Sequence, residues 1–323
     1  MGDPLLNILI PRQTLDVSLD QSMIRRFGKS TRLMIDSGAY IDFSNDRDPM
    51  NVFDWIAWAR QMKRDVIDYV AEFSGLVSLD VIGDPRATRR NYEIIRDAGI
   101  DVLPVITRGA PDEDIERYLD TSDYICLGGV ARGGARERSI VKSLEARLPD
   151  THRRHWLGFG PLNFVTRYRP YSYDSTGIAS GNMYSNITLL MSDGRLRIIR
   201  DKVLTADDRR LIRKAGFNPN LAARPPAYKR DYQSIHSCLS VASYIDYGRM
   251  IEDRLGSRYH FACHARPEFT VQVYQRHLGG ICLPVLSAFE MYTLFGFDRV
   301  GAGAITEDEL PEGRDAHDHW RDR

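Results

Sequence analysis

One pattern recurs along the first half of this chain and limits the folds open to it: an apolar run, a carboxylate or glycine turn, then a helix. The plainest copy is TRLMIDSGAY at residues 31–40, where three apolar residues lead to Asp36 and Ser37-Gly38-Ala39 turn the backbone. Such a run is typical of a parallel strand whose carboxyl end faces a site. A single aspartate at this place is more often a helix cap, so the recurrence carries the weight.

Further copies of the pattern follow at residues 76–80, 101–105, 124–127, 155–160 and 171–175. Helical patterns lie between them. From Asn51 to Phe73 apolar residues recur every three to four positions, and Asp84-Pro85 supplies an N-cap followed by a first-turn proline. Strands that alternate with helices over short connections predict a parallel sheet, either doubly wound or closed into a (β/α)8 barrel.

We favour the α/β barrel of the TIM type, because it brings the carboxyl ends of all its strands to one mouth. The residues expected there are Asp36, Asp80, Gly128-Gly129, Gly158 and Asp174. Residues 5–10 would form the first strand, and a strand within 187–199, around the hairpin turn Asp193-Gly194, would bring the count to eight. We therefore expect a catalytic barrel with basic insertions over residues 1–230 and a helical extension packed on it over 231–323.

Composition excludes few partners. Of 323 residues 43% are hydrophobic and the formal net charge is zero. Residues 151–230, however, contain fifteen Lys and Arg against five Asp and Glu, with tyrosines between them. This segment is either a polyanion-binding surface or a set of solvated helix faces. No run approaches the roughly 18 apolar residues of a membrane span, the N-terminus lacks the order of a signal peptide, and four scattered cysteines predict a reducing compartment.

Three aspartates at one barrel mouth would suit glycosyl transfer. Carboxylates in different environments can divide the roles of nucleophile and general acid or base, and transfer with retention needs two of them. The glycine-rich turn at residues 128–134 lacks the Lys-Ser/Thr of a P-loop and the spacing of a dinucleotide fingerprint. It could approach a flat ligand or a phosphate closely.

Taken in order, these motifs resemble the tRNA-guanine transglycosylase superfamily. The matching stretches are DSGAY at 36–40, the strand ending at Asp80, GGVARG at 128–133, WLGFG at 156–160 and YDST at 173–176. They span roughly residues 30–180. The resemblance implies a (β/α)8 barrel enzyme, a pentosyltransferase that exchanges guanine for a 7-deazaguanine base without a cofactor.

The resemblance also implies roles for single residues. Asp174 would be the nucleophile, and Asp36 the general acid and base at the exchanged base. The substrate-binding residues would be Ser37, Tyr40 (which stacks on the base), Asp80 (which recognises it), Gly128 and Gly129. The target nucleotide must be flipped out or single-stranded to enter such a site.

The chain departs from the tRNA enzymes in lacking their cysteine-rich zinc site and a separate RNA-binding domain. The remaining candidate zinc ligands are His236, Cys238, His260, Cys263, His264 and Cys282. Their spacing fits no standard zinc pattern, so we expect no metal at these residues. A compact chain of this kind looks most like the DNA-modifying branch of phages and bacteria. This predicts DNA as the polymer, with tRNA second, a free preQ0-like 7-deazaguanine as the incoming base, and work beside other modification enzymes in the bacterial or phage-infected cytoplasm.

Two other readings stay open at this point. One is a barrel enzyme acting on a small nucleoside or phosphorylated substrate, with the basic segment serving solubility. The other is a catalytically silent relative that binds nucleic acid.

Overall fold

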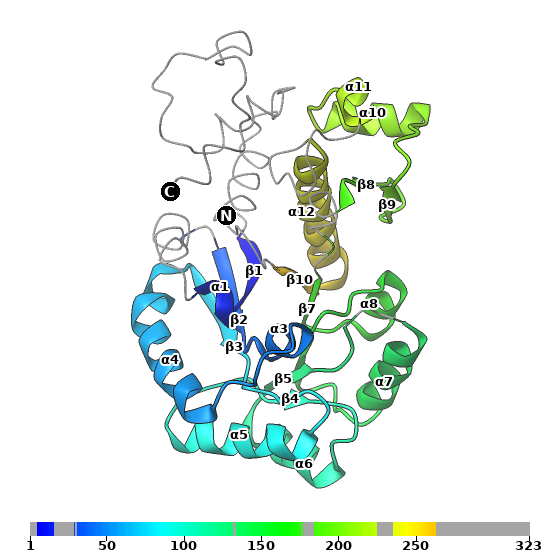
Figure 1. Ribbon diagram of the computed structural model, residues 1–323. Coiled ribbons are helices and arrows are strands. Elements are labelled where there is room, and N and C mark those ends of the chain that lie inside the picture. Colours follow the sequence, from blue (N-terminus) through cyan, green and yellow to red (C-terminus); the bar gives the residue numbers. More distant parts are fainter. Residues whose placement is uncertain are drawn as a thin grey trace, which may run out of the picture.

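A computed structural model describes residues 5–15, 29, 31–131, 134–175, 177, 184–224 and 235–262. Its main feature is an eight-stranded, wholly parallel sheet that curls, with helices on its outer side (Figure 1). The strands lie in the order β3-β2-β1-β10-β7-β6-β5-β4. Their bounds are β1 Leu6–Pro11, β2 Thr31–Asp36, β3 Glu72–Leu76, β4 Val105–Ile106, β5 Tyr124–Leu127, β6 Arg153–Trp156, β7 Ser172–Ser175 and β10 Arg258–Ala262.

The two outer strands of this order, β3 and β4, approach each other beyond their paired ends. Val77 and Leu103 form an isolated parallel bridge. The Leu103 amide donates to Leu76 O at 2.8 Å, and the Ser78 amide donates to Leu103 O at 3.0 Å. The curl therefore brings the beginning and the end of the sheet into contact at this point.

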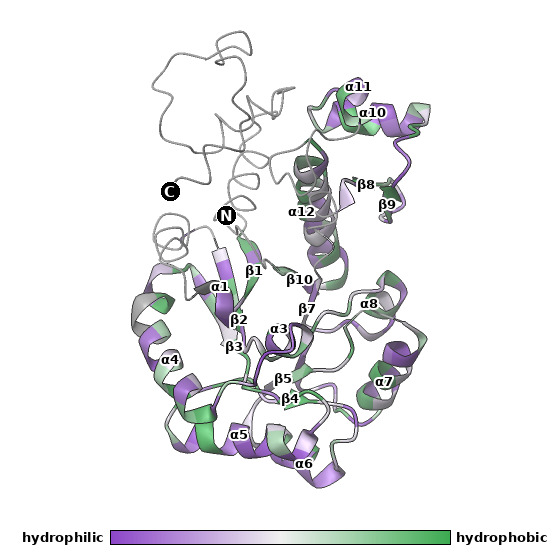
Figure 2. Ribbon diagram, in the orientation of Figure 1, coloured by the Kyte–Doolittle hydropathy of each residue, from purple (hydrophilic) through white to green (hydrophobic). Residues whose placement is uncertain are grey.

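Helices connect successive strands and cover the outside of the curl, as Figure 1 shows for α4 to α8. Helix α5 follows its predicted start, because the Asp84 side chain accepts from the Ala87 amide at 2.9 Å and Pro85 occupies the first turn. In Figure 2 helices α5, α6 and α7 mix hydrophilic and hydrophobic stretches, as expected for helices with one face on a core. These helices are α1 Arg12–Leu15, α3 Ala39–Ser44, α4 Val52–Asp65, η2 Ile67–Tyr69 (3₁₀), α5 Pro85–Asp97, α6 Asp112–Thr121, α7 Ala135–Glu145 and α8 Leu162–Tyr168.

In β1, β2 and β5, alternate residues enter two different hydrophobic clusters. Ile8, Leu33 and Ile125 pack in the large cluster that joins the sheet to the helices. Leu9, Met34 and Cys126 belong to a second, smaller cluster. Because successive side chains of a strand point to opposite faces, the second cluster fills the inside of the curl.

An insertion separates β7 from β10. It contains the antiparallel hairpin of β8 (Ile187–Leu190) and β9 (Leu196–Ile199), the helices α10 (Ala206–Lys214) and α11 (Pro219–Ala222), and the long helix α12 (Ile235–Leu255). The hairpin docks on α12, where the Ser243 hydroxyl donates to Thr188 O at 2.7 Å. None of the described helices is long and apolar enough to cross a membrane.

The expected eighth strand within residues 187–199 is wrong. The Asp193-Gly194 turn does form a hairpin, but β8 and β9 pair with each other in a separate sheet. The eighth strand is β10, which pairs with β1 on one side and β7 on the other. The sheet thus takes strands from both sides of the boundary at residue 230 that we expected from the sequence.

The strand before Asp80 also begins earlier than expected. Helix α4 ends at Asp65 and β3 occupies Glu72–Leu76, so Asp80 lies four residues beyond the strand. The apolar residues Val66, Val70 and Phe73 continue the helical spacing but pack into the same core from a 3₁₀ turn and a strand. A register shift opposite Leu33 and Met34 accommodates the early strand.

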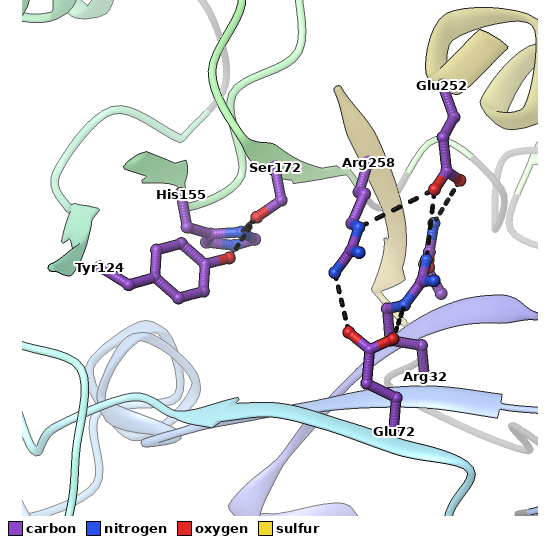
Figure 3. A network of polar contacts seen from close by, with 8 residues as sticks. Arg32, Glu72, Tyr124, His155, Ser172, Glu252 and Arg258 are labelled. Carbon is purple, nitrogen blue, oxygen red and sulfur yellow. Dashed lines mark hydrogen bonds and ion pairs between the residues drawn. The ribbon is translucent and has the colours of Figure 1, made fainter. Parts of the chain in front are cut away.

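Figure 3 shows a polar network that joins four strands of the sheet to α12 at the amino ends of the strands. Glu72 on β3 accepts from Arg32 on β2 at 2.7 Å and from Arg258 on β10 at 2.8 Å. Arg32 also donates to Asn7 on β1 at 2.7 Å and to Glu252 on α12 at 3.3 Å. Charged groups thus close this end of the curl, which leaves the carboxyl ends as the place for a site.

Candidate active site at the carboxyl ends of the strands

Asp36 is the last residue of β2, and the turn that follows aims its carboxylate inward. Asp36 lies two residues after Met34, so it shares the inner face of the sheet. Gly38 has φ 82°, a conformation that glycine adopts without strain. The backbone amides of Gly38 and Ser37 hydrogen-bond to the Asp36 carboxylate. The DSG sequence is therefore the local requirement for this geometry.

A buried anchor holds this turn from the end of β1. The Gln13 side chain donates to both Gly38 O and Asp42 Oδ1 at 2.8 Å. Arg12 forms a buried ion pair with the same Asp42 at 2.9 Å. Asp42 lies in the first turn of α3, so Arg12 and Gln13 fix the helix that begins directly after the DSG turn.

Asp80 reaches the same region from the loop after β3. Its Oδ1 accepts from the Ser37 hydroxyl at 2.9 Å, and Ser37 Oγ in turn accepts from the Ala39 amide at 3.2 Å. Burial raises the pKa of Asp80, while the hydrogen bond from Ser37 acts in the opposite direction. Ser37 thus links the carboxylates of two neighbouring strands.

Asp174, the predicted nucleophile, is the third residue of β7 and is buried. The Gly158 amide donates to its Oδ1 at 2.8 Å, and His155 Nε2 lies 3.2 Å from the same oxygen. Both hydrogen bonds go to Oδ1. Gly158 has φ 67°, so the glycine of the WLGFG stretch is needed to turn this amide toward the aspartate.

A chain of three buried side chains continues behind Asp174. His155 Nδ1 contacts the Ser172 hydroxyl, which in turn contacts the Tyr124 hydroxyl, as Figure 3 shows. One direction of donation satisfies every member: Tyr124 to Ser172, Ser172 to His155 Nδ1, and His155 Nε2 to Asp174. This network fixes the tautomer of His155 with its proton on the nitrogen that faces Asp174.

The sequence alone does not predict a role for His155, Ser172 or Tyr124. His155 stands in an apolar strand, and its relation to Asp174 depends on the pairing of His155 with Ser172 across β6 and β7. A serine, histidine and aspartate in contact also suggest a hydrolytic triad. Ser172 and His155 are completely buried, however, so the serine cannot attack an external substrate, and Asp174 is the member that faces the end of the sheet.

The three predicted aspartates share one electrostatic environment. Burial, followed by the negative charges of Asp80 and Asp174, raises the pKa of Asp36 from 3.8 to about 7. Burial and the charges of the same three carboxylates also raise the pKa of the Cys126 thiol, which lies in the inner cluster. The structure therefore brings Asp36, Asp80 and Asp174 together, as the sequence predicted.

The glycine pair follows β5, and packing alone explains its first member. A Cβ on Gly128 would lie 2.7 Å from Val105 Cγ1, and the Gly128 amide donates to Ile106 O at 2.9 Å. That amide is thus engaged in the sheet. Gly129 has φ 70° and open space around its Cα, which leaves it the more suitable of the two for a ligand.

Tyr40 lies on α3, four residues after Asp36, with 41% of its surface exposed. Its ring is therefore not committed to the hydrophobic core, and it stands beside the turn that carries Asp36. This placement is compatible with a stacking role.

The sequence matches no known protein family, and no curated protein is significantly similar to it.

Among the described residues, no group of three or more His, Cys, Asp or Glu side chains could hold a metal ion. His236 and Cys238 are buried on α12, where His236 Nε2 donates to Ala222 O at 2.9 Å. His260 is buried on β10 and packs edge-to-face on His155, with 5.6 Å between ring centroids. The other three candidate ligands, Cys263, His264 and Cys282, lie outside the described residues.

Proposed function

We propose that this protein is a transglycosylase that exchanges guanine for a 7-deazaguanine base in DNA through a covalent aspartyl-glycosyl intermediate. One observation carries the proposal: Asp36 at the end of β2, Asp80 in the loop after β3 and Asp174 on β7 lie together, and Asp36 has a pKa near neutrality. Such a carboxyl group can give and take a proton at physiological pH. Together with the motif order of the sequence, this arrangement favours base exchange over the other readings.

The proposal includes a complete (β/α)8 barrel. On one side of β10 lie β1, β2 and β3, and on its other side lie β7, β6, β5 and β4. The Val77–Leu103 bridge joins the region after β3 to the region before β4. This is the neighbour relation of a barrel whose eighth strand follows an insertion. In a barrel the inner cluster would be its packed interior and the three aspartates would line its mouth.

In the first step, Asp174 Oδ2 would attack C1′ of the target nucleoside. We assign Oδ2 because both hydrogen bonds that this carboxylate forms with described residues go to Oδ1. A carboxylate–C1′ bond forms, the glycosidic C1′–N9 bond breaks, and its electron pair leaves with guanine. Asp36 in its protonated form supplies the proton that guanine takes up.

In the second step, the incoming 7-deazaguanine would lose its N9 proton to the Asp36 carboxylate that the first step produced. N9 then attacks C1′, the bond to Asp174 breaks, and Asp174 leaves as a carboxylate. Two inversions give net retention at C1′, and both aspartates return to their starting protonation states.

The other predicted residues would hold the base. Asp80 would accept hydrogen bonds from its N–H groups, with Ser37 fixing the orientation of that carboxylate. Tyr40 would stack on its face, and Gly129 beside Gly128 would allow close approach of the ring. Because duplex bases are out of reach, the nucleotide would enter single-stranded or flipped out.

The decisive experiment supplies the protein with radiolabelled 7-deazaguanine and, in separate reactions, single-stranded DNA, duplex DNA or tRNA. We expect label in DNA and a covalent protein–DNA adduct that maps to Asp174. Asp174→Asn should bind the oligonucleotide normally but lower exchange by about 10³-fold or more, because the covalent step is lost. Label in tRNA alone would overturn the choice of polymer, and full exchange by Asp174→Asn would overturn the mechanism.

A further inference from the structure

A groove on the flank of the candidate site has no role in the mechanism above. It encloses a cavity of 540 Å³ between the loop that leads from β4 to α6 and one face of α7. Arg108 and Gly109 form one side, and Ile140 and Leu144 are buried beneath it. Its other lining residues, all on or just after α7, are Arg136, Ser139, Ser143 and Arg147. We call it the α7 groove.

Two positive charges in the α7 groove have no ion-pair partner among the residues that the structure describes. Arg147 is balanced, because its guanidinium pairs with Asp112 and donates to Ala110 O at 2.9 Å. Arg108 and Arg136 are exposed, and neither forms an ion pair with a carboxylate in the described part of the chain. Their net charge of about +2 therefore faces the cavity.

Hydroxyl groups stand beside these charges. Ser139 and Ser143 are four residues apart on α7, so they lie one above the other on the same face of the helix. Guanidinium groups flanked by hydroxyl donors suit phosphate oxygens, which accept several hydrogen bonds and fit the planar arginine fork.

The two arginines without an ion-pair partner in the described residues, Arg108 and Arg136, lie at the same edge of the sheet as the aspartates. Arg108 follows the last residue of β4 by two positions, and Arg136 lies in the first turn of the helix that follows β5. The turn after β5 packs directly on the β4 loop, since a Cβ on Gly128 would meet Val105 and Thr107. A strand of nucleic acid whose target base enters among the aspartates would therefore pass this flank.

We propose that the α7 groove binds phosphodiester groups of the polynucleotide next to the exchanged nucleotide, through Arg108 and Arg136. The inference rests on the proposed function and names where the substrate's backbone is held. It adds a specific site to the broad expectation that the basic segment 151–230 holds the phosphates. Five of the twelve arginines of that segment form ion pairs with carboxylates: Arg153, Arg154, Arg195, Arg197 and Arg210.

The test compares two double variants of the full chain that remove equal charge. Arg108→Ala/Arg136→Ala empties the groove of its free cations. Arg90→Ala/Arg249→Ala removes two exposed arginines on α5 and α12, outside the groove. Affinity for a fluorescent single-stranded oligonucleotide is measured by anisotropy between 50 and 300 mM salt, and base exchange is measured at saturating oligonucleotide.

Each phosphate contact with a single strand contributes about 0.7 to the slope of log affinity against log salt. The groove variant should therefore lose about 1.4 from that slope and bind about 25-fold more weakly at about 0.1 M salt. The control variant should match the wild type in both measurements.

Other outcomes separate the two proposals. If the wild type exchanges bases and the groove variant keeps the wild-type salt slope, the groove assignment is wrong while the proposed function stands. If the wild type neither exchanges bases nor binds the oligonucleotide, the proposed function fails with it. Equilibrium dialysis with labelled inorganic phosphate distinguishes the sources: loss of phosphate binding with unchanged oligonucleotide affinity would assign the groove to a free phosphate compound and overturn our proposal.

Discussion

At the scale of single residues, the ionised form of Asp36 destabilises the folded protein. Burial and two neighbouring carboxylates raise its pKa from 3.8 to about 7, and the Ser37 and Gly38 amides offset this only in part. Between these pH values the folded protein keeps a proton that the unfolded chain has released. The contribution of Asp36 therefore makes the protein less stable as pH rises from about 4 to about 7, after which the loss is complete.

Replacing Asp36 with asparagine should remove this pH-dependent loss. At pH 4 the unfolding free energy of Asp36→Asn should nearly equal that of the wild type. At pH 8 it should exceed the wild-type value by a few kcal/mol, with about 4 kcal/mol as the upper limit. Urea denaturation at both pH values measures it. A difference that is equal at both pH values, or larger at pH 4, would show that Asp36 titrates normally.

His155 should act by positioning Asp174 rather than by contacting substrate. In His155→Asn the amide is too short to reach Asp174 Oδ1, so we expect the turnover rate to fall by about 10- to 100-fold with little change in KM, as expected for a misplaced nucleophile. His155→Gln can place its Nε2 donor near the original nitrogen and should recover most of the rate. Steady-state exchange kinetics measure both, and equal losses in the two variants would point to a general packing defect instead.

At the scale of elements, the sequence predicted the strands whose two faces are both apolar. Residues 124–127 form β5 as expected, and β2 ends at Asp36 as expected. Both strands were predictable because their residues read as a continuous apolar run. The aspartates were found for the same reason, since a carboxylate at the end of such a run stands out against the pattern.

Strand β10 was not predicted, because two side chains on its inner face, those of Arg258 and His260, are polar. Tyr259 and Phe261 pack toward the helices, whereas Arg258 enters the network with Glu72 and His260 is buried beside His155. Such alternation resembles an ordinary amphipathic edge strand, while the apolar hairpin at 187–199 offers a stronger local signal. The groups that His155 and Arg258 contact come from other strands, so periodicity within one segment cannot reveal them.

The DSG turn depends on packing between two elements as well as on its own glycine. Gly38 has φ 82°, and a Cβ there would overlap the Gln13 side chain. Gly38→Ala should therefore lower the unfolding free energy by about 2 kcal/mol or more through backbone strain and the clash together.

Replacing Gln13 in the Gly38→Ala variant separates the two causes of this loss of stability, backbone strain and the clash with the Gln13 side chain. Gln13→Ala alone should cost about 1 to 2 kcal/mol, because two hydrogen bonds are lost. The double variant should be more stable than the sum of the single changes predicts, since the clash no longer exists. Strict additivity in urea denaturation would mean that the side chain of Gln13 moves aside at no cost.

At the scale of the whole molecule, the sheet depends on a strand from beyond the insertion. Strand β10 lies between β1 and β7, and its residue Arg258 also bonds to Glu72 on β3. A chain that ends at residue 230 would leave the facing edges of β1 and β7 without their shared neighbour.

We therefore expect that deleting residues 231–323 abolishes cooperative unfolding rather than releasing a stable barrel. Near-ultraviolet circular dichroism and urea denaturation of the truncated chain measure this, and residues 1–262 provide the matched control that keeps β10. A truncated chain that unfolds cooperatively would show that the first seven strands form an independent unit.

The pairing of β1 with β10 also bears on how the chain reaches its native state. Ile8 pairs with Phe261, positions 253 residues apart, and this contact lies in the middle of the sheet rather than at its margin. Non-local pairings of this kind must overcome the entropy of closing a long loop before they contribute to stability, which slows folding. During synthesis β1 would leave the ribosome before β10, with β2 as its available partner, and would hold an unpaired edge until β10 emerged, so the nascent chain should depend on chaperones over that interval.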